Sequence, residues 1–269
     1  MSSPAGFTVL KAPASAANAR VSALRILALE AQAEWLRLMR APAFCVPVLG
    51  FPILFYLLFG VALAPRQGGA EVGRATLAMF TVFGVMAPGL FGMGVTLAMD
   101  RDRGLLALKR ALPMPPGVYL AAKLLVSVLF AVLAASLLAG LAVTVGHAAL
   151  AFFEVCELLV LAALGVLPFC GLGLLIGTLV KGQAAAAVIN LVYLPMSFLS
   201  GVLLPLAILP RFLAHLAPFW PAYHLAQLAL AVAGARGMAA GGAGGHVLTL
   251  GGMTLVFFAI ARARLRRRG

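Results

Sequence analysis

The sequence has few charged residues and very few acidic ones. Only 10% of its 269 residues are charged, and 20 Lys and Arg stand against 7 Asp and Glu. Because 64% of the residues are hydrophobic, a water-soluble globular protein is excluded. The net charge of +13 does not indicate nucleic-acid binding, since the basic residues gather at the ends of apolar runs, as topology signals do. The composition therefore indicates an integral membrane protein with no nucleic-acid partner.

Motifs for nucleotide hydrolysis and for hydrolytic catalysis are absent as well. The sequence contains no G-x-x-x-x-G-K-[ST], no H-E-x-x-H and no G-x-S-x-G. Asp100 and Asp102 alternate with arginines that neutralise them, and the three cysteines have no metal-ligand spacing. We therefore expect no catalytic residue, bound cofactor or metal in this chain. We interpret the four histidines, which lie near predicted span ends, as interfacial residues: His147, His215, His224 and His246.

Six apolar runs are long enough to cross a bilayer, which takes about 20 helical residues. With the amino terminus provisionally inside, sixteen basic residues fall on the inner side and four on the outer side. The sequence thus predicts an all-α membrane protein with six transmembrane helices and both termini in the cytoplasm. The expected spans are residues 43–64, 76–99, 117–146, 151–180, 184–204 and 243–261.

The segments outside the spans divide the chain further. We expect a disordered leader over 1–17, an amphipathic interfacial helix over 18–41 with Asn18 as its N-cap, a membrane domain over 42–262 and a basic tail over 263–269. The helix either positions the bundle as an elbow or only anchors the amino terminus. Its apolar stripe consists of Leu24, Leu27, Ala28, Ala31, Trp35 and Leu38.

The segment from Asp100 to Pro116 is a charged island between the second and third spans. Six of its first eleven residues are ionised, and each would cost about 2.5–3.5 kcal/mol at a bilayer centre. The island is therefore expected to lie in water. Four leucines alternate with Lys109 and Arg110 at helical spacing before prolines end the pattern. This predicts a short amphipathic helix on which a partner docks.

Four prolines between Ser200 and Tyr223 prevent one continuous helix in that stretch. Its scarcity of charge favours short helices that re-enter the outer leaflet over an ordinary surface loop. The glycine-rich residues 237–245 then form a flexible joint into the last span.

Two features inside the spans have competing interpretations. Glu154 and Glu157 are three residues apart and share one face at the start of the fourth span, where they either bind protons or a cationic substrate or simply reach water. Gly173 and Gly177 form a G-x-x-x-G pair, which we interpret as close helix packing.

Three stretches, taken in order, resemble the type-2 ATP-binding-cassette export permeases, a family that includes drug, polysaccharide and nodulation-factor exporters. They are EAQAEWLRLMRAPAF, DRDRGLLALKRALPMPPGVYLAAK and SGVLLPLAILPRFLAHLAPFWPAYHLAQLAL. The resemblance extends from about residue 24 to residue 262. One departure is the Trp220–His224 stretch, where many members carry Asn-Pro-Leu-Thr-Tyr, so the outer gate differs in polarity.

The resemblance implies a transport subunit, not an enzyme, that works with separate ATPase subunits, which bind ATP and Mg²⁺, and with a second permease subunit, identical or paralogous. It also implies a bacterial inner-membrane location and a translocation path for an amphiphilic or hydrophobic substrate. Its ATPase-coupling helix maps onto Asp100, Arg101, Asp102, Arg103, Gly104, Leu105, Leu108, Lys109, Arg110, Leu112 and Pro113. Its outer gate, built from re-entrant helices, maps onto Pro205, Pro210, Pro218, Pro221 and Tyr223.

A proton-coupled secondary transporter that uses Glu154 and Glu157 is the alternative hypothesis. It predicts an inverted internal repeat, and no convincing repeat is visible. A membrane-embedded enzyme ranks last, because the sequence holds no catalytic constellation.

Overall fold

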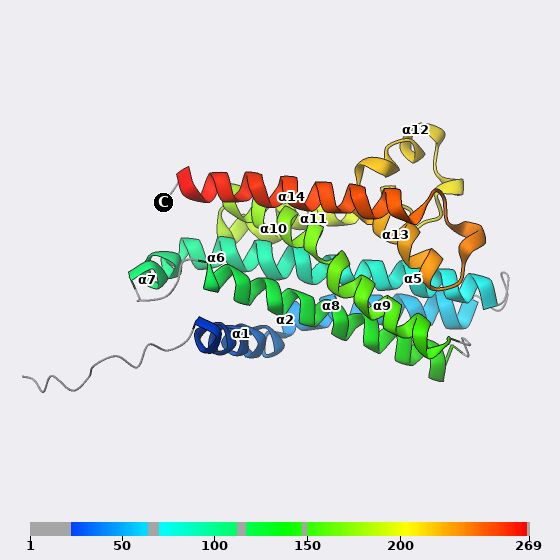
Figure 1. Cartoon of the computed structure of the whole chain (residues 1–269), viewed down its shortest axis with the longest axis horizontal. Helices are drawn as coiled ribbons and strands as arrows, with labels where there is room; N and C mark the ends of the chain where they lie inside the picture. The colour runs from blue at the N-terminus through cyan, green and yellow to red at the C-terminus, as the bar shows by residue number, and fades with distance from the viewer. Residues whose placement is uncertain (1–22, 64–69, 112–116, 147–149, 268–269) are drawn as a thin grey trace, which may run out of the picture.

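The structure, a computed structural model, describes residues 23–63, 70–111, 117–146 and 150–267 (Figure 1). Within these residues the elements are helices, and six of them are long and apolar enough to cross a membrane. The prediction of an all-α protein with six spans is thereby confirmed. The spans are Pro42–Leu63, Ala70–Asp102, Val118–Thr144, Phe152–Leu179, Gly182–Leu199 and Ala243–Arg266.

The second span lies at the centre of the bundle and the sixth lies at its edge. The second consists of α5 (Ala70–Ala87), the π-helical η3 (Pro88–Val95) and α6 (Thr96–Asp102), and 83% of its most apolar window is buried. The sixth, α14 (Ala243–Arg267), has only 6% buried. Large apolar side chains on α14, such as Leu248 and Leu255, are therefore exposed at the edge of the bundle.

The first and fourth spans are interrupted helices. The first joins α2 (Pro42–Cys45), η1 (Val46–Gly50), α3 (Phe51–Phe55) and η2 (Tyr56–Leu63). Prolines stand near the start of η1, α3 and η3, where they remove backbone donors and favour wider turns. The fourth joins α9 (Phe152–Gly165) to α10 (Leu167–Leu179).

Glycines bring the second and fourth spans into backbone contact. A Cβ atom on Gly173 would lie 2.7 Å from the carbonyl oxygen of Gly89, and one on Gly177 would lie 2.6 Å from that of Gly94. Any side chain at these positions would force η3 and α10 apart. The packing interpretation of the G-x-x-x-G pair is confirmed.

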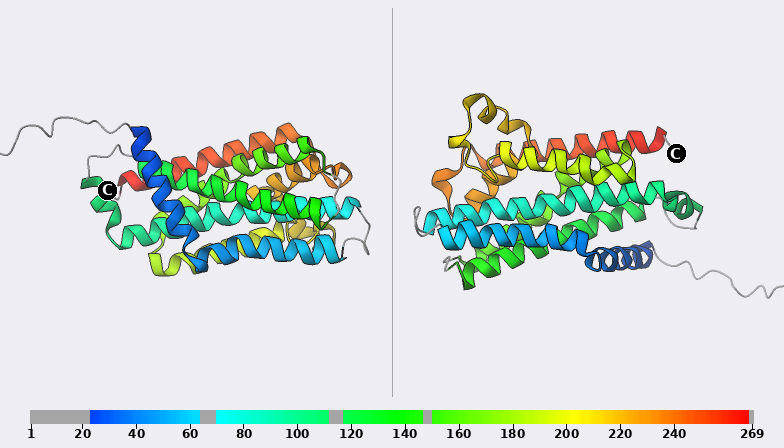
Figure 2. Two further views of the ribbon diagram at one scale, coloured as in Figure 1. Left: turned by 90° about the horizontal axis from the view of Figure 1, so that it is seen from below. Right: turned by 180° about the vertical axis from the view of Figure 1, so that it is seen from behind.

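The amino-terminal helix α1 (Ala23–Met39) lies across one end of the bundle, at a steep angle to the spans (Figure 2). It packs on α8 (Val118–Thr144), where the rings of Trp35 and Phe130 have centroids 4.7 Å apart. Of the predicted stripe, Ala31 and Leu38 are buried, whereas Leu24 is 77% exposed. The predicted leader and the Asn18 cap lie outside the described residues.

The proline-broken segment forms short helices, as expected. The fifth span, α11 (Gly182–Leu199), ends five residues before the predicted end, because Gly201 adopts φ +80° while Val202 donates its backbone N–H to Ser197. Short helices η4, α12 and η5 follow and protrude at the end remote from α1 (Figure 1). These are η4 (Leu206–Ile208), α12 (Arg211–Ala214) and η5 (Ala217–Phe219). They are followed by α13 (Pro221–Val232) and η6 (Arg236–Met238).

Candidate coupling site and membrane cavity

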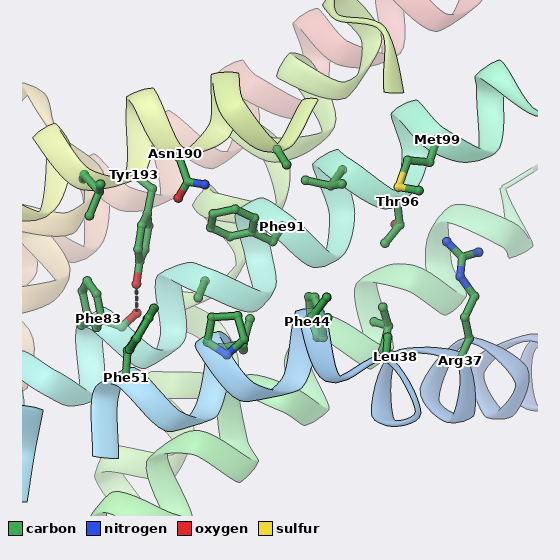
Figure 3. A pocket seen from close by; sticks show the side chains of 18 of the residues that line it. Arg37, Leu38, Phe44, Phe51, Phe83, Phe91, Thr96, Met99, Asn190 and Tyr193 are labelled. Atoms are coloured by element: carbon green, nitrogen blue, oxygen red, sulfur yellow. Dashed lines mark hydrogen bonds between the residues drawn. The ribbon is translucent and has the colours of Figure 1, made fainter. Parts of the chain in front are cut away.

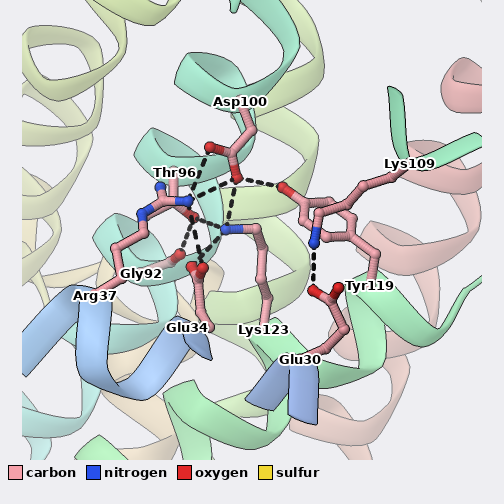
Figure 4. Close-up of polar contacts among 9 residues, drawn as sticks. All are labelled: Glu30, Glu34, Arg37, Gly92, Thr96, Asp100, Lys109, Tyr119 and Lys123. Atoms are coloured by element: carbon pink, nitrogen blue, oxygen red, sulfur yellow. Dashed lines mark hydrogen bonds and ion pairs between the residues drawn. The ribbon is translucent and has the colours of Figure 1, made fainter. Parts of the chain in front are cut away.

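A cluster of buried charges joins α1, α6 and α8 (Figure 4). The Nζ atom of Lys123 lies 2.5 Å from Glu34 Oε1 and 3.0 Å from Asp100 Oδ2. Arg37 lies 2.9 Å from Asp100 Oδ1 and 3.4 Å from Glu34 Oε2. The side chains of Lys123 and Asp100 are each only 1% exposed. Two carboxylates therefore face two cations, and the cluster is electrically neutral.

Hydrogen bonds satisfy the remaining polar atoms of the cluster. Tyr119 donates its hydroxyl hydrogen to Asp100, with 2.5 Å between the oxygens. Lys123 also donates to the Thr96 hydroxyl over 2.8 Å, and Thr96 in turn donates to the Gly92 carbonyl. A buried ion pair is stable only when its other donors and acceptors are also bonded, and this network meets that need for Lys123, Asp100 and Glu34, whereas the Arg37 side chain is 38% exposed.

A second ion pair attaches α7 (Leu105–Ala111) to α1. Lys109 on α7 pairs with Glu30 on α1, and its Nζ lies 4.8 Å from the centre of the Tyr119 ring. The Nζ of Lys123 lies 5.1 Å from the same centre. Tyr119 thus contacts both ammonium groups through its ring and Asp100 through its hydroxyl. α7, α1 and the cluster form one connected unit.

The last residues of the second span hold the connection between the fourth and fifth spans. Arg101 donates to the backbone carbonyls of Gly177, Thr178 and Val180 over 2.6–3.1 Å, where α10 ends. Asp102 accepts a hydrogen bond of 2.6 Å from the backbone N–H of Gly182, where α11 begins. A cation at a helix C-terminus and an anion at a helix N-terminus both oppose the local helix dipole charge. Consecutive residues therefore bind different spans.

The island differs from its sequence-based description in two ways. Asp100 is buried, so the expectation that the whole island lies in water is wrong for this residue. The helix is also not continuous, because Gly104 at φ +73° separates α6 from α7. The predicted coupling residues divide as follows: Asp100, Arg101 and Asp102 end α6, Arg103 and Gly104 form the turn, Leu105, Leu108, Lys109 and Arg110 lie on α7, and Leu112 and Pro113 lie outside the described residues.

A cavity of about 720 Å³ lies between α1, the first and second spans, and α11 (Figure 3). Aromatic rings form much of its wall, among them Phe44, Phe51 and Phe91. Arg37 lies at one end and Tyr193 at the other, where its hydroxyl donates to the Phe83 carbonyl over 3.1 Å. Such a wall suits an apolar or amphiphilic molecule, with a few polar groups to orient it.

Arg37 belongs to both the cavity and the cluster. Its guanidinium group binds Asp100, and its side chain lines the cavity. Asn190, on the opposite wall, is an exposed amide in the middle of α11. A polar side chain exposed at this depth of a span indicates contact with protein or with a polar ligand group instead of lipid.

The other candidate residues lie at the end of the bundle remote from α1. Glu154 pairs with Arg74 over 3.0 Å and caps α9 by accepting a 2.8 Å hydrogen bond from the Ala151 N–H. Glu157 is half-buried on the same helix. These contacts give Glu154 a structural role, and they favour neither proton transfer nor substrate binding. Of the predicted gate residues, Pro221 is buried, Tyr223 is half-buried, and Pro205, Pro210 and Pro218 are exposed.

Sequence reasoning missed the centre of the cluster. Lys123 was counted as a loop-flanking topology signal, and Glu34 received no role. One signal in the sequence does point to the cluster. It is a charged residue at a position where the periodic pattern of a buried helix face, or of a membrane span, requires an apolar residue. Glu34 lies on the same helix face as Ala31 and Leu38, and Lys123 lies six residues inside the third span.

The cluster predicts a large loss of stability for Lys123→Met. The substitution removes the cation that contacts both carboxylates and leaves two buried negative charges with Arg37 alone, so we expect a cost of about 3–5 kcal/mol. Thermal unfolding in detergent, followed by circular dichroism, measures it. The control is Lys181→Met at an exposed position, which should have no effect. Equal stability of the two variants would contradict the structural role of the cluster.

Comparison with known proteins places the chain among transporters. Residues 27–232 match the family model described as "ABC-2 type transporter". The chain is also similar to the "Putative transport permease YvfS" of Bacillus subtilis (strain 168), with 27% identity over 202 residues, which cover 75% of this chain and 82% of that protein. The family match spans most of the chain, including five of the six spans and the charge cluster. The chain therefore belongs to the ABC-2 type transporter family.

Proposed function

We propose that this chain is the membrane-spanning permease subunit of an ATP-driven exporter, which passes an amphiphilic or hydrophobic substrate through the cavity. The observation that carries the proposal is the position of Arg37, which lines the cavity and binds the cluster attached to α7. A force applied to α7 would reach α1, and with it the cavity wall, through two ion pairs. These are Lys109–Glu30 and Asp100–Arg37. Packed interfaces with two discrete arrangements transmit motion in this way.

Separate ATPase subunits dock on α7 in this proposal. Leu108 is 59% exposed on α7, next to a glycine turn that sets this helix off from the second span. The sequence has no P-loop, so ATP and Mg²⁺ bind to the partner and this chain needs no cofactor of its own. Substrate movement is then powered by closure of the ATPases, which presses on α7 and α1.

A second permease subunit, identical or paralogous, completes the path. Large apolar side chains are exposed beside the cavity on both the first span and α11, with Phe51 at 50%, Leu54 at 57% and Leu191 at 74%. The exposed amide of Asn190 lies among them. A partner helix laid on this face would cover the apolar surface and give the amide a polar neighbour.

The proposed orientation puts both termini in the cytoplasm of a bacterial inner membrane. Basic residues are concentrated at the end of the bundle that holds α1, α7 and the end of α14. The short helices from Pro205 to Tyr223 are then on the outer side, where they form the gate through which substrate leaves.

Docking on α7 predicts loss of the ATPase when its apolar face is charged. We expect the double variant Leu105→Asp/Leu108→Asp to abolish co-purification of the ATPase subunit, since both substitutions place a carboxylate in the interface. The control Phe212→Asp/Leu216→Asp introduces the same charge at two exposed sites at the opposite end of the bundle. Retention of the ATPase by the double variant, with both proteins well folded, would rule out α7 as the docking site.

Transport through the cavity predicts inhibition when the cavity is filled. Ala186 on α11 lines the cavity, whereas Ala184 is exposed on the same helix and does not line it. In inverted vesicles that contain the permease and its ATPase, we expect Ala186→Trp to reduce uptake of fluorescent amphiphiles at least tenfold and Ala184→Trp to leave it unchanged. Equal transport by the two variants would place the substrate path elsewhere.

A further inference from the structure

Two histidines meet at the end of the bundle remote from α1. His224 lies on α13 and His246 lies in the first turn of α14, and their Nδ1 atoms are 2.8 Å apart. Each ring uses its other nitrogen to contact a backbone carbonyl. His224 Nε2 lies 2.8 Å from the Pro218 oxygen, and His246 Nε2 lies 2.7 Å from the Ala240 oxygen. Both rings therefore have partners at both nitrogens.

These distances determine where the hydrogens are. A carbonyl oxygen only accepts hydrogen bonds, so each Nε2 carries a hydrogen. A neutral imidazole has one N–H, and its Nδ1 would then present a lone pair. Two neutral rings would place two lone pairs against each other at 2.8 Å. We propose that the two imidazoles bind one proton between their Nδ1 atoms, so that the pair carries a single positive charge and links α13 to α14.

The surrounding backbone is arranged to hold the rings. Ala240 donates its N–H to Gln227 Oε1 over 2.6 Å and accepts from His246 through its oxygen. Gln227 and His224 are three residues apart on α13, so one helix face binds both the connecting segment and the second ring. Gly241 adopts φ +80°, and a Cβ there would lie 3.1 Å from His246 Nε2. A side chain at this position would push the ring away.

Within the part of the chain that the structure describes, no carboxylate forms an ion pair or a hydrogen bond with either ring. The Tyr223 ring lies 5.3 Å from His224 and 5.9 Å from His246, between centroids. Arg74 is paired with Glu154 and also donates to the Ala233 carbonyl. The partner of each Nδ1 atom is therefore the Nδ1 atom of the other imidazole. The other ionisable residues of the elements around α13 are Glu71, Glu157, Arg211, His215 and Arg236.

The shared proton has a mechanical consequence. α13 is buried in the bundle, whereas α14 is peripheral, and the proton forms a direct link between them. A second proton would place two N–H groups and two positive charges against each other and break that link. Burial lowers the pKa of His224, and a positive charge on His246 lowers it further, so the folded chain resists protonation of both rings at once. Acidification on this side of the membrane would release the first turn of α14 from α13.

Histidine-selective ¹⁵N NMR of the full chain in lipid nanodiscs tests the proposal, because the sequence has only 4 histidines. At pH 7 we expect a scalar coupling between the Nδ1 atoms of His224 and His246. His246→Asn should abolish the coupling, and the exposed control His215→Asn should leave it intact. Absence of the coupling in the wild type would overturn the proposal.

Thermal stability gives a second measurement with a defined sign. Below about pH 6.5, the ordinary pKa of a histidine, the unfolded chain binds more than one proton at these two histidines, whereas the folded pair holds one. The unfolded state therefore binds more protons, and the melting temperature should fall as the pH falls. The double variant His224→Asn/His246→Asn should lose this dependence, while His215→Asn should keep it. Identical pH profiles for the wild type and the double variant would refute the shared proton.

Discussion

The arrangement of the end of the bundle that holds α1 depends on one interaction, the contact between Lys123 and the carboxylates of Glu34 and Asp100. A buried charge without a partner costs several kcal/mol, so each of these residues constrains where the others lie. Glu34 fixes α1, Asp100 fixes the end of the second span, and Lys123 fixes the start of the third. Hydrophobic packing of Trp35 on Phe130 strengthens the same contact but does not define its register.

The end of the second span distributes this constraint to the remaining helices. Asp100 binds α1 and α8, Arg101 binds the end of α10, and Asp102 binds the start of α11. Three consecutive side chains on a helix point about 100° apart, which lets each reach a different neighbour. The second span is also the most buried one. A displacement of α6 would therefore also displace residues on four other helices, which are α1, α8, α10 and α11.

The parts of the fold that follow from local composition could be predicted from sequence. Six spans were visible because apolar length alone decides whether a helix crosses a bilayer, and Gly173 and Gly177 were recognisable as packing residues because small residues allow backbones to approach. The proline-broken segment was equally visible. Span ends were less accurate, since the end of α11 depends on the turn at Gly201.

The parts that depend on long-range contacts could not be predicted. Glu34 and Lys123 are 89 residues apart, and periodicity contains no information about which distant charge a buried residue meets. The cavity likewise needs side chains from α1, from the first and second spans and from α11. His224 and His246 were treated as unrelated interfacial residues, because their contact depends on the path of the segment that connects α13 to α14.

In the proposed exporter, the cluster makes α1, the end of the second span and α8 move as one body when the ATPase acts. Double electron–electron resonance between spin labels on the assembled transporter, without nucleotide and with ATP trapped, measures this directly. Exposed positions are available at Leu24 on α1, Val143 on α8 and Leu191 on α11. We expect the Leu24–Val143 distance to remain constant and the Leu24–Leu191 distance to change. A change of similar size in both distances would contradict the account.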